Sequence, residues 1–215
     1  MWNDTELQVQ VENALAWEPG VHSNHIAVAV KDGAVQLAGH VDTFWEKCAA
    51  ERAAWRVAHV KSVANGLRVE LPFTALRADD DIALAAMGNL EWNCVVPETV
   101  EVQVADGVVT LSGEVDEHYQ RHEAERALRS LKAITGIRNE IVVRSSTRTL
   151  DVKLPIEEAL RRNALVNASH IKVHVSHGVV RLQGSAHSRA EHDQAMEAAW
   201  AAPGACVVED HITIT

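Results

Sequence analysis

Residues 100–113 read VEVQVADGVVTLSG, and their pattern is the strongest indication of the fold. Apolar residues alternate with other residues as far as Asp106-Gly107, and a second alternating run follows. Alternation with period two is typical of a strand with one buried face, and a Gly after Asp supplies the positive φ that a tight turn needs. The stretch therefore predicts two antiparallel strands joined by a hairpin.

The same pattern occurs three times in the 215 residues. Residues 26–39 read IAVAVKDGAVQLAG and residues 171–184 read IKVHVSHGVVRLQG, with Gly at the same two places. Self-similarity in a fixed register indicates a tandem array of one supersecondary unit. We interpret the first Gly of each pair as a turn residue and the second as the exit from the strand toward a helix. These structural glycines are Gly33, Gly39, Gly107, Gly113, Gly178 and Gly184.

Helical patterns flank each hairpin. After the hairpin, Thr43 with Glu46 and Ser188 with Glu191 have the spacing of a capping box, which marks the start of a helix. A shorter helical pattern precedes each hairpin, and a Val- and Ile-rich strand closes each unit. The sequence thus predicts an α+β fold of three tandem α-β-β-α-β domains. Each is expected to be a three-stranded mixed sheet with two helices packed on one face.

The predicted domains are residues 1–73, 74–147 and 148–215. The formal net charge of −10 opposes attraction to nucleic acid phosphates, so no nucleic acid partner is expected. No run of about 18 apolar residues indicates a transmembrane segment. The acidic start does not resemble a signal peptide. As written, the sequence predicts a cytoplasmic protein, or a periplasmic one if an export signal has been removed.

Cys48, Cys94 and Cys206 share no short spacing, so neither a disulfide framework nor a CxxC metal site is predicted. The chain contains no GxxxxGK[ST] phosphate loop and no GxGxxG string. No Ser, Cys or Asp lies beside a recognisable base in a shared motif. We therefore predict no catalytic residues and no cofactor.

Two stretches of the third repeat resemble a known family. Residues 156–164, IEEALRRNA, and residues 198–204, AAWAAPG, together with the shared pattern Ile-x-Val-x-Val-x-x-Gly-x-Val-x-Leu-x-Gly, are similar to the BON domain. The resemblance covers nearly the whole chain. It implies bacterial proteins of osmotic stress and transport, attachment to phospholipid surfaces and, in one branch of the family, potassium binding.

These observations predict a non-enzymatic binding protein that recognises a phospholipid surface or a protein partner. The alternative is a stress protein that binds a small ion or a metal. The third repeat offers a surface for the first function, because alternation places His170, Lys172, His174, Arg181 and Gln183 on the open face of its sheet. A lipid headgroup, a phosphate or an acidic protein could bind there. The simpler interpretation is a solvated face, since strand exteriors are normally polar.

The first repeat offers a different surface. Phe44, Cys48 and Trp55 are predicted to face outward from its second helix, and Ala27 and Ala29 occupy the open face of its sheet. Such an apolar exterior indicates docking against another repeat, a second subunit or a membrane. We therefore count Phe44 and Trp55 among the candidate lipid- or partner-binding residues. Packing within the protein is the simpler alternative.

The second repeat carries the candidate metal ligands His118, His122 and Glu125. Their i, i+4 and i+7 spacing places them on one face of a helix, where two imidazoles four residues apart can chelate a metal. An exposed charged face is the alternative, because the sequence shows no fourth ligand. The acidic run at residues 79–81 is interpreted as a helix start, where carboxylates favour the helix dipole.

Overall fold

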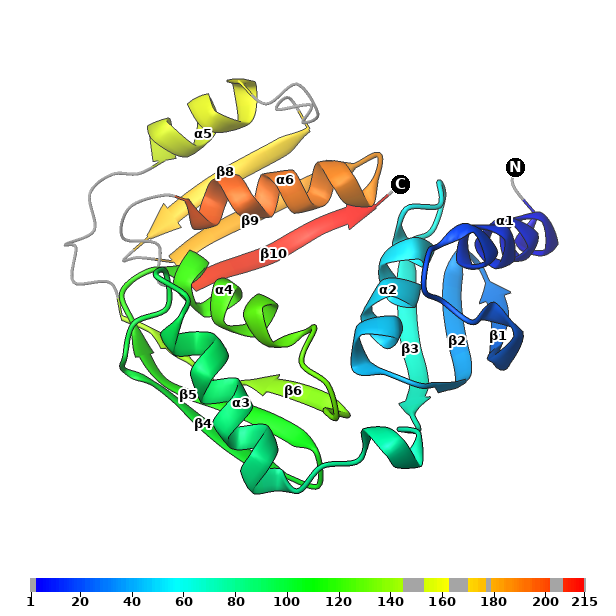
Figure 1. The fold of residues 1–215 in the computed structure, drawn as a ribbon. Helices are drawn as coiled ribbons and strands as arrows, with labels where there is room; N and C mark the ends of the chain where they lie inside the picture. The colour runs from blue at the N-terminus through cyan, green and yellow to red at the C-terminus, as the bar shows by residue number, and fades with distance from the viewer. Residues whose placement is uncertain (1–2, 145–152, 163–169, 177–178, 202–206, 215) are drawn as a thin grey trace. The chain divides into compact units, whose positions relative to one another are not determined.

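The computed structural model describes residues 3–144, 153–162, 170–176, 179–201 and 207–214. Three successive sets of helices and strands follow the predicted order (Figure 1). The first repeat consists of α1 (Asp4–Trp17), a short 3-10 turn η1 (Ser23–His25), β1 (Ile26–Lys31), β2 (Ala34–Val41), α2 (Phe44–Trp55) and β3 (Ser62–Val69).

The second repeat follows a 3-10 turn, η2 (Phe73–Ala75), and consists of α3 (Asp79–Glu91), β4 (Val100–Ala105), β5 (Val108–Val115), α4 (His118–Leu128), β6 (Gly136–Asn139) and β7 (Val142–Val143). The third repeat consists of α5 (Lys153–Arg162), β8 (Ile171–Ser176), β9 (Val179–Ala186), α6 (Arg189–Trp200) and β10 (Val207–Ile214).

Each repeat has a mixed sheet with the second hairpin strand in its centre. The central strand is antiparallel to the strand before it and parallel to the one that follows the second helix. In the second repeat this last strand is interrupted, so that β6 and β7 each pair with β5. The predicted α+β fold of three α-β-β-α-β units is confirmed.

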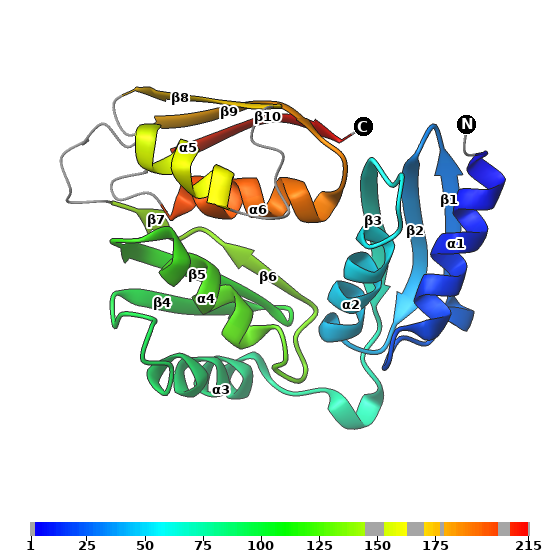
Figure 2. The ribbon, with the colours of Figure 1, turned by 90° about the horizontal axis from the view of Figure 1, so that it is seen from above.

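The helices lie on one face of each sheet, as Figure 2 shows for α1 and α2 and for α5 and α6. In the first repeat, Leu7 and Val11 of α1 pack with Leu37 of β2 in a core of fully buried side chains. In the third repeat, Leu182 of β9 packs with Ala195 of α6. The small Ala side chain lets the helix approach the sheet closely. Burial of each large aliphatic side chain contributes about 1.5–3 kcal/mol.

The hairpin turns have the predicted geometry. Asp32 and Gly33 both have positive φ, of 53° and 82°, and Asp106 and Gly107 have φ of 52° and 73°. Positive φ at both central residues is the type I′ turn, whose twist matches that of the flanking strands. Gly178 lies outside the described residues.

An aspartate at the start of the first helix binds each of these two turns, a contact that the sequence alone did not indicate. In the second repeat, the Asp79 carboxylate accepts hydrogen bonds from the backbone N–H groups of Asp106 (2.9 Å) and Gly107 (3.0 Å). In the first repeat, Asp4 accepts from the corresponding N–H groups of the Asp32-Gly33 turn. The first residue of the acidic run therefore begins α3, as predicted, and also fixes the turn.

The second glycine of each pair has a role different from the one predicted. Gly39, Gly113 and Gly184 lie within β2, β5 and β9 rather than at their exits, and their φ values of 124°, 110° and 145° strain any residue with a side chain. A Cβ at Gly39 would lie 2.1 Å from the carbonyl oxygen of His25, and the other two positions are equally crowded. Glycine is needed there because a neighbouring backbone approaches too closely for a side chain. No described helix has the length and apolarity to cross a bilayer.

Candidate functional site

The open face of the third sheet is the candidate binding surface. Helices α5 and α6 lie on the other face of β8, β9 and β10 (Figure 2). Along β8, Ile171 and Val173 are buried toward the helices, whereas Lys172 and His174 are exposed. The alternation of the strand therefore separates a core face from a polar face, as the sequence predicted.

The structure brings all five predicted residues of this surface together. Lys172 lies opposite Gln183 in the antiparallel pairing of β8 with β9, and His174 lies opposite Arg181. These four residues and His170 are exposed. The imidazole of His170 also meets the ring of His187 edge-on, with 5.5 Å between ring centroids. Their role in binding a lipid or a partner stays a prediction.

Strand β10 adds two residues to this face that the sequence interpretation missed. Glu209 lies opposite Arg181 in the parallel pairing with β9, and His211 lies opposite Gln183. The Glu209 carboxylate is 2.6 Å from Nε of Arg181, so it offsets that charge. The Lys172 ammonium forms no ion pair with a described residue. Lys172 is therefore the least compensated cation of this surface.

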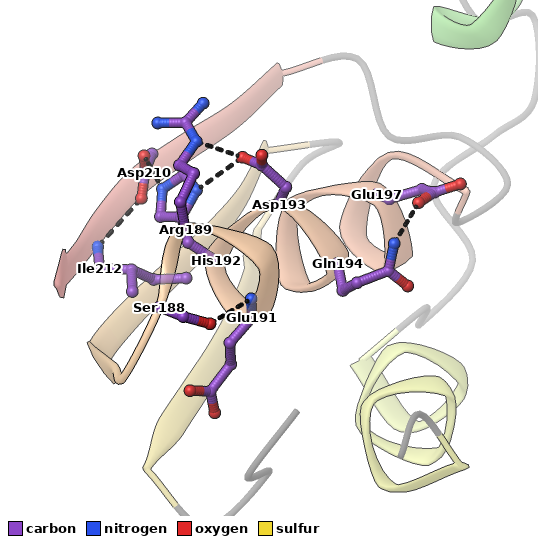
Figure 3. Close-up of polar contacts among 9 residues, drawn as sticks. All are labelled: Ser188, Arg189, Glu191, His192, Asp193, Gln194, Glu197, Asp210 and Ile212. Carbon is purple, nitrogen blue, oxygen red and sulfur yellow. Dashed lines mark hydrogen bonds and ion pairs between the residues drawn. The ribbon is translucent and has the colours of Figure 1, made fainter. Parts of the chain in front are cut away.

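A buried histidine holds β10 against α6 beneath this surface (Figure 3). The His192 residue is 7% exposed. Its Nε2 lies 2.8 Å from Oδ2 of Asp210 on β10, and its Nδ1 lies 3.1 Å from Oδ1 of Asp193 on the same helix. The second Asp210 oxygen, Oδ1, accepts a hydrogen bond from the Ile212 backbone N–H at 3.0 Å. We call this set of contacts the helix–strand tie.

Both ring nitrogens of His192 face carboxylate oxygens, and only the protonated imidazolium can donate at both positions. The hydrogen bond with Asp193, followed by the hydrogen bond and charge of Asp210, raises the pKa of His192, although burial opposes this. Burial alone would raise the pKa of Asp193, but His192 and the Arg189 guanidinium, 2.7 Å away, hold that pKa below its ordinary value. The tie is therefore a charge-assisted contact.

Comparison with known families assigns all three repeats. A family model described as the BON domain matches residues 3–70, 78–145 and 152–215. The chain belongs to the BON domain family. This confirms the resemblance that the sequence shows in all three repeats.

Proteins from two bacteria are similar to this BON-domain protein. Osmotically-inducible protein Y of Escherichia coli strain K12 is 27% identical over 144 residues, which cover 62% of this chain and 72% of that protein. Two structures of CdsD, described as a structural protein of the type III secretion system of Chlamydia trachomatis, align at 16% and 14% identity. They cover 98% and 100% of this chain and 92% and 100% of theirs, with TM-scores of 0.28 and 0.27. TM-scores at this level do not establish a shared arrangement.

The other two BON repeats also join the second helix to the last strand, but they do so through an asparagine and a glutamate instead of a histidine. In the first repeat the Asn65 amide donates to Oε2 of Glu51 at 3.0 Å, and in the second the Asn139 amide donates to Glu125 at 3.3 Å. In the third repeat the strand position is Asp210, and the helix position of the glutamate holds Met196. His192, one helical turn before Met196, makes the contact with Asp210 instead. Among these described contacts, a titratable imidazole joins the second helix of a repeat to its last strand in the third repeat alone.

The apolar surface predicted for the first BON repeat is only partly present. Ala27 and Ala29 are exposed on the sheet, as expected. Trp55, however, is half-buried and packs against the core of the repeat rather than facing outward. Phe44 and Cys48 are also half-buried, and burial raises the pKa of the Cys48 thiol. Phe44 and Trp55 are therefore not fully exposed, and their role in binding a lipid or a partner stays a prediction.

The predicted metal ligands of the second BON repeat lie on α4 but are not drawn together. Within the described part of the chain, the ligand atoms of His118, His122 and Glu125 do not all lie within 4.8 Å of one another. The Glu125 carboxylate instead binds Arg129 at 2.8 Å. Burial would raise the Glu125 pKa, but the Arg129 hydrogen bond and charge lower it. Metal binding by these three residues stays a prediction.

Among the thiols, Cys94 is exposed and Cys206 lies outside the described residues.

Proposed function

We propose that this BON-domain protein is a non-enzymatic binding protein whose third repeat contacts an anionic phospholipid surface. The observation that carries the proposal is the cluster of exposed cationic and imidazole side chains on the sheet face opposite α5 and α6. A basic residue near an anionic membrane contributes about 1 kcal/mol of attraction. Lys172 supplies that charge without a described carboxylate partner, and Arg181 supplies it in part.

The shape and charge of the open sheet face support contact with a flat membrane rather than enclosure of a small substrate. An open sheet presents its side chains side by side, which suits a flat partner. The whole chain carries a net charge of −10, which an anionic membrane repels, so only an oriented approach through this face is favourable. The binding is therefore expected to be weak and to fall with salt. Similarity to the osmotically inducible protein supports a role in stress.

The test is flotation of the intact chain with zwitterionic liposomes and with liposomes that contain an anionic lipid, at low and moderate salt. We expect flotation only with anionic liposomes at low salt. The double variant Lys172→Glu/Arg181→Glu should lose it. The matched control is Lys132→Glu/Arg138→Glu, which changes the net charge equally at two exposed positions of the second repeat. This control should retain most of the binding.

A second variant tests the ion pair on the surface. Glu209→Gln removes the carboxylate that compensates Arg181, so we expect stronger flotation than for the wild-type chain. Absence of flotation with anionic liposomes at low salt would exclude the lipid and leave a protein partner as the occupant of the face. An equal loss in the control variant would show that net charge, rather than this face, governs binding.

A further inference from the structure

A loop of the first repeat is held against the N-terminus of α2. Glu18 forms an ion pair with Arg56 at the far end of that helix. Gly20, with φ of 80°, lies so close to the ring of Trp45 that a Cβ there would meet it at 2.7 Å. These contacts place His22, which follows in the loop, directly over the first turn of α2. These contacts fix the loop, while the His22 side chain itself stays largely exposed beside Glu46.

Three potential metal ligands meet at this point. The Glu46 side chain is 3% exposed, and its Oε1 lies 3.0 Å from Nδ1 of His22. Two backbone N–H groups orient the carboxylate: that of His22 donates to Oε1 at 2.6 Å and that of Asp42 donates to Oε2 at 3.0 Å. One ligand atom from each of His22, Asp42 and Glu46 lies within 4.8 Å of the other two. No other such group of three is found among the described residues.

The donor set suits a divalent transition metal. Bonds of about 2.0–2.2 Å place neighbouring ligand atoms roughly 3.0–3.5 Å apart, and the His22 Nδ1 to Glu46 Oε1 distance falls in this range. Imidazole favours zinc and its neighbours over magnesium and calcium. With His22 neutral, the two carboxylates carry two negative charges, which a divalent cation neutralises. The exposed Asp42 side chain can close on the ion, and water can complete the coordination.

The fold itself does not require this combination of residues. The corresponding positions of the second repeat hold Val96, Asp116 and Gln120. There, the Gln120 side-chain oxygen accepts a hydrogen bond from the Glu117 backbone N–H at 3.1 Å. A neutral amide therefore satisfies the start of the helix equally well. The helix start accounts for an acceptor at this position, but it does not account for an imidazole brought from a separate loop.

We propose that His22, Asp42 and Glu46 form a binding site for a divalent transition-metal cation, with Zn²⁺ as the favoured ion. The site lies in the first repeat, and it is independent of lipid binding by the third. His22 supplies Nδ1, while its Nε2 carries the proton of the neutral ring. Glu46 supplies Oε1 and Asp42 supplies one carboxylate oxygen. The orientation of Glu46 by two backbone N–H groups prepares the site before the ion arrives.

The test is calorimetric titration of the intact, untagged chain with Zn²⁺, supported by Co²⁺ absorption spectra that report the coordinating atoms. We expect one site, and a loss of affinity of about tenfold or more in His22→Ala and in Glu46→Gln. Glu46→Gln introduces the residue that the second repeat has naturally, so the start of α2 is retained. Circular dichroism of each variant checks that the fold is unchanged.

Two control variants distinguish this site from other histidines. His25→Ala removes a neighbouring imidazole outside the cluster, and His122→Ala removes a candidate ligand on α4. Both should bind Zn²⁺ as the wild-type chain does. The proposal is overturned if the wild-type chain shows no saturable Zn²⁺ binding, or if His22→Ala and Glu46→Gln bind with unchanged affinity. Loss of binding in His122→Ala alone would also overturn it, because the ion would then bind to α4.

Discussion

Replacement of His192 by Ala removes both hydrogen bonds of the helix–strand tie in the third repeat. A hydrogen bond to a charged group contributes about 1.5–3 kcal/mol when its partner stays buried after the loss. The side chains of Asp193 and Asp210 are 52% and 37% exposed, so water rehydrates them and much of that contribution is recovered. We therefore expect His192→Ala to lower the free energy of unfolding of the third repeat by about 1–2 kcal/mol under mildly acidic conditions.

The effect should depend on pH in a defined direction. The folded-state pKa of His192 lies above its ordinary value of about 6.5, so protonation favours the folded state. The stabilisation is fully present below about pH 6.5 and is lost as pH rises through the folded-state pKa. The lowered pKa of Asp193 acts in the other direction: its contribution is present above about pH 4 and is lost as pH falls through its folded-state pKa. The variant should therefore differ most from the wild-type chain near pH 5.5, which lies between these limits.

Hydrogen exchange measures this effect locally. The amides of α6 and β10, the Ile212 N–H among them, should exchange faster in His192→Ala at about pH 5.5, with a smaller difference at about pH 8.5 after correction for intrinsic rates. The matched control is Asn65→Ala in the first repeat. This variant breaks the contact of Asn65 with Glu51, which involves no histidine. Its loss of amide protection should therefore be similar at about pH 5.5 and at about pH 8.5. An effect of His192→Ala that is equal at both pH values, or larger at the higher one, would refute the assignment of an imidazolium.

Three further predictions concern the second repeat. Gly113→Ala should lower the free energy of unfolding by about 2–4 kcal/mol, because the new Cβ would lie 2.1 Å from the Thr99 carbonyl oxygen. Chemical denaturation measures this loss, and a variant as stable as the wild-type chain would contradict the crowding. Leu111→Ala should cost about 3 kcal/mol, because the side chain is fully buried; a loss below about 1 kcal/mol in the same assay would argue against a packed core. Asp79→Ala should cost about 1 kcal/mol and speed amide exchange at Gly107, whereas unchanged exchange would show that the carboxylate does not fix the turn.

Much of the fold could be predicted because its signals are local. Alternation along residues 100–113 and the Asp106-Gly107 turn depend on neighbours in the chain, and the structure has both. The same alternation correctly placed Lys172 and His174 on the open face. Trp55 shows the limit of such reasoning. Helical spacing assigned it to the outside, but the packing of α2 on its own sheet covers part of the ring.

Local sequence patterns were sufficient to predict the three repeats, their strands and turns, the family and the polar face of the third sheet. The folded chain was needed to show which side chains meet: Glu209 with Arg181, Asp210 with His192, and His22 with Glu46, across separations of 28, 18 and 24 residues. A strand pattern specifies the direction in which a side chain points, but its neighbours depend on pairing register and helix packing. Those are set by burial of the whole core, to which residues far apart in the chain contribute together.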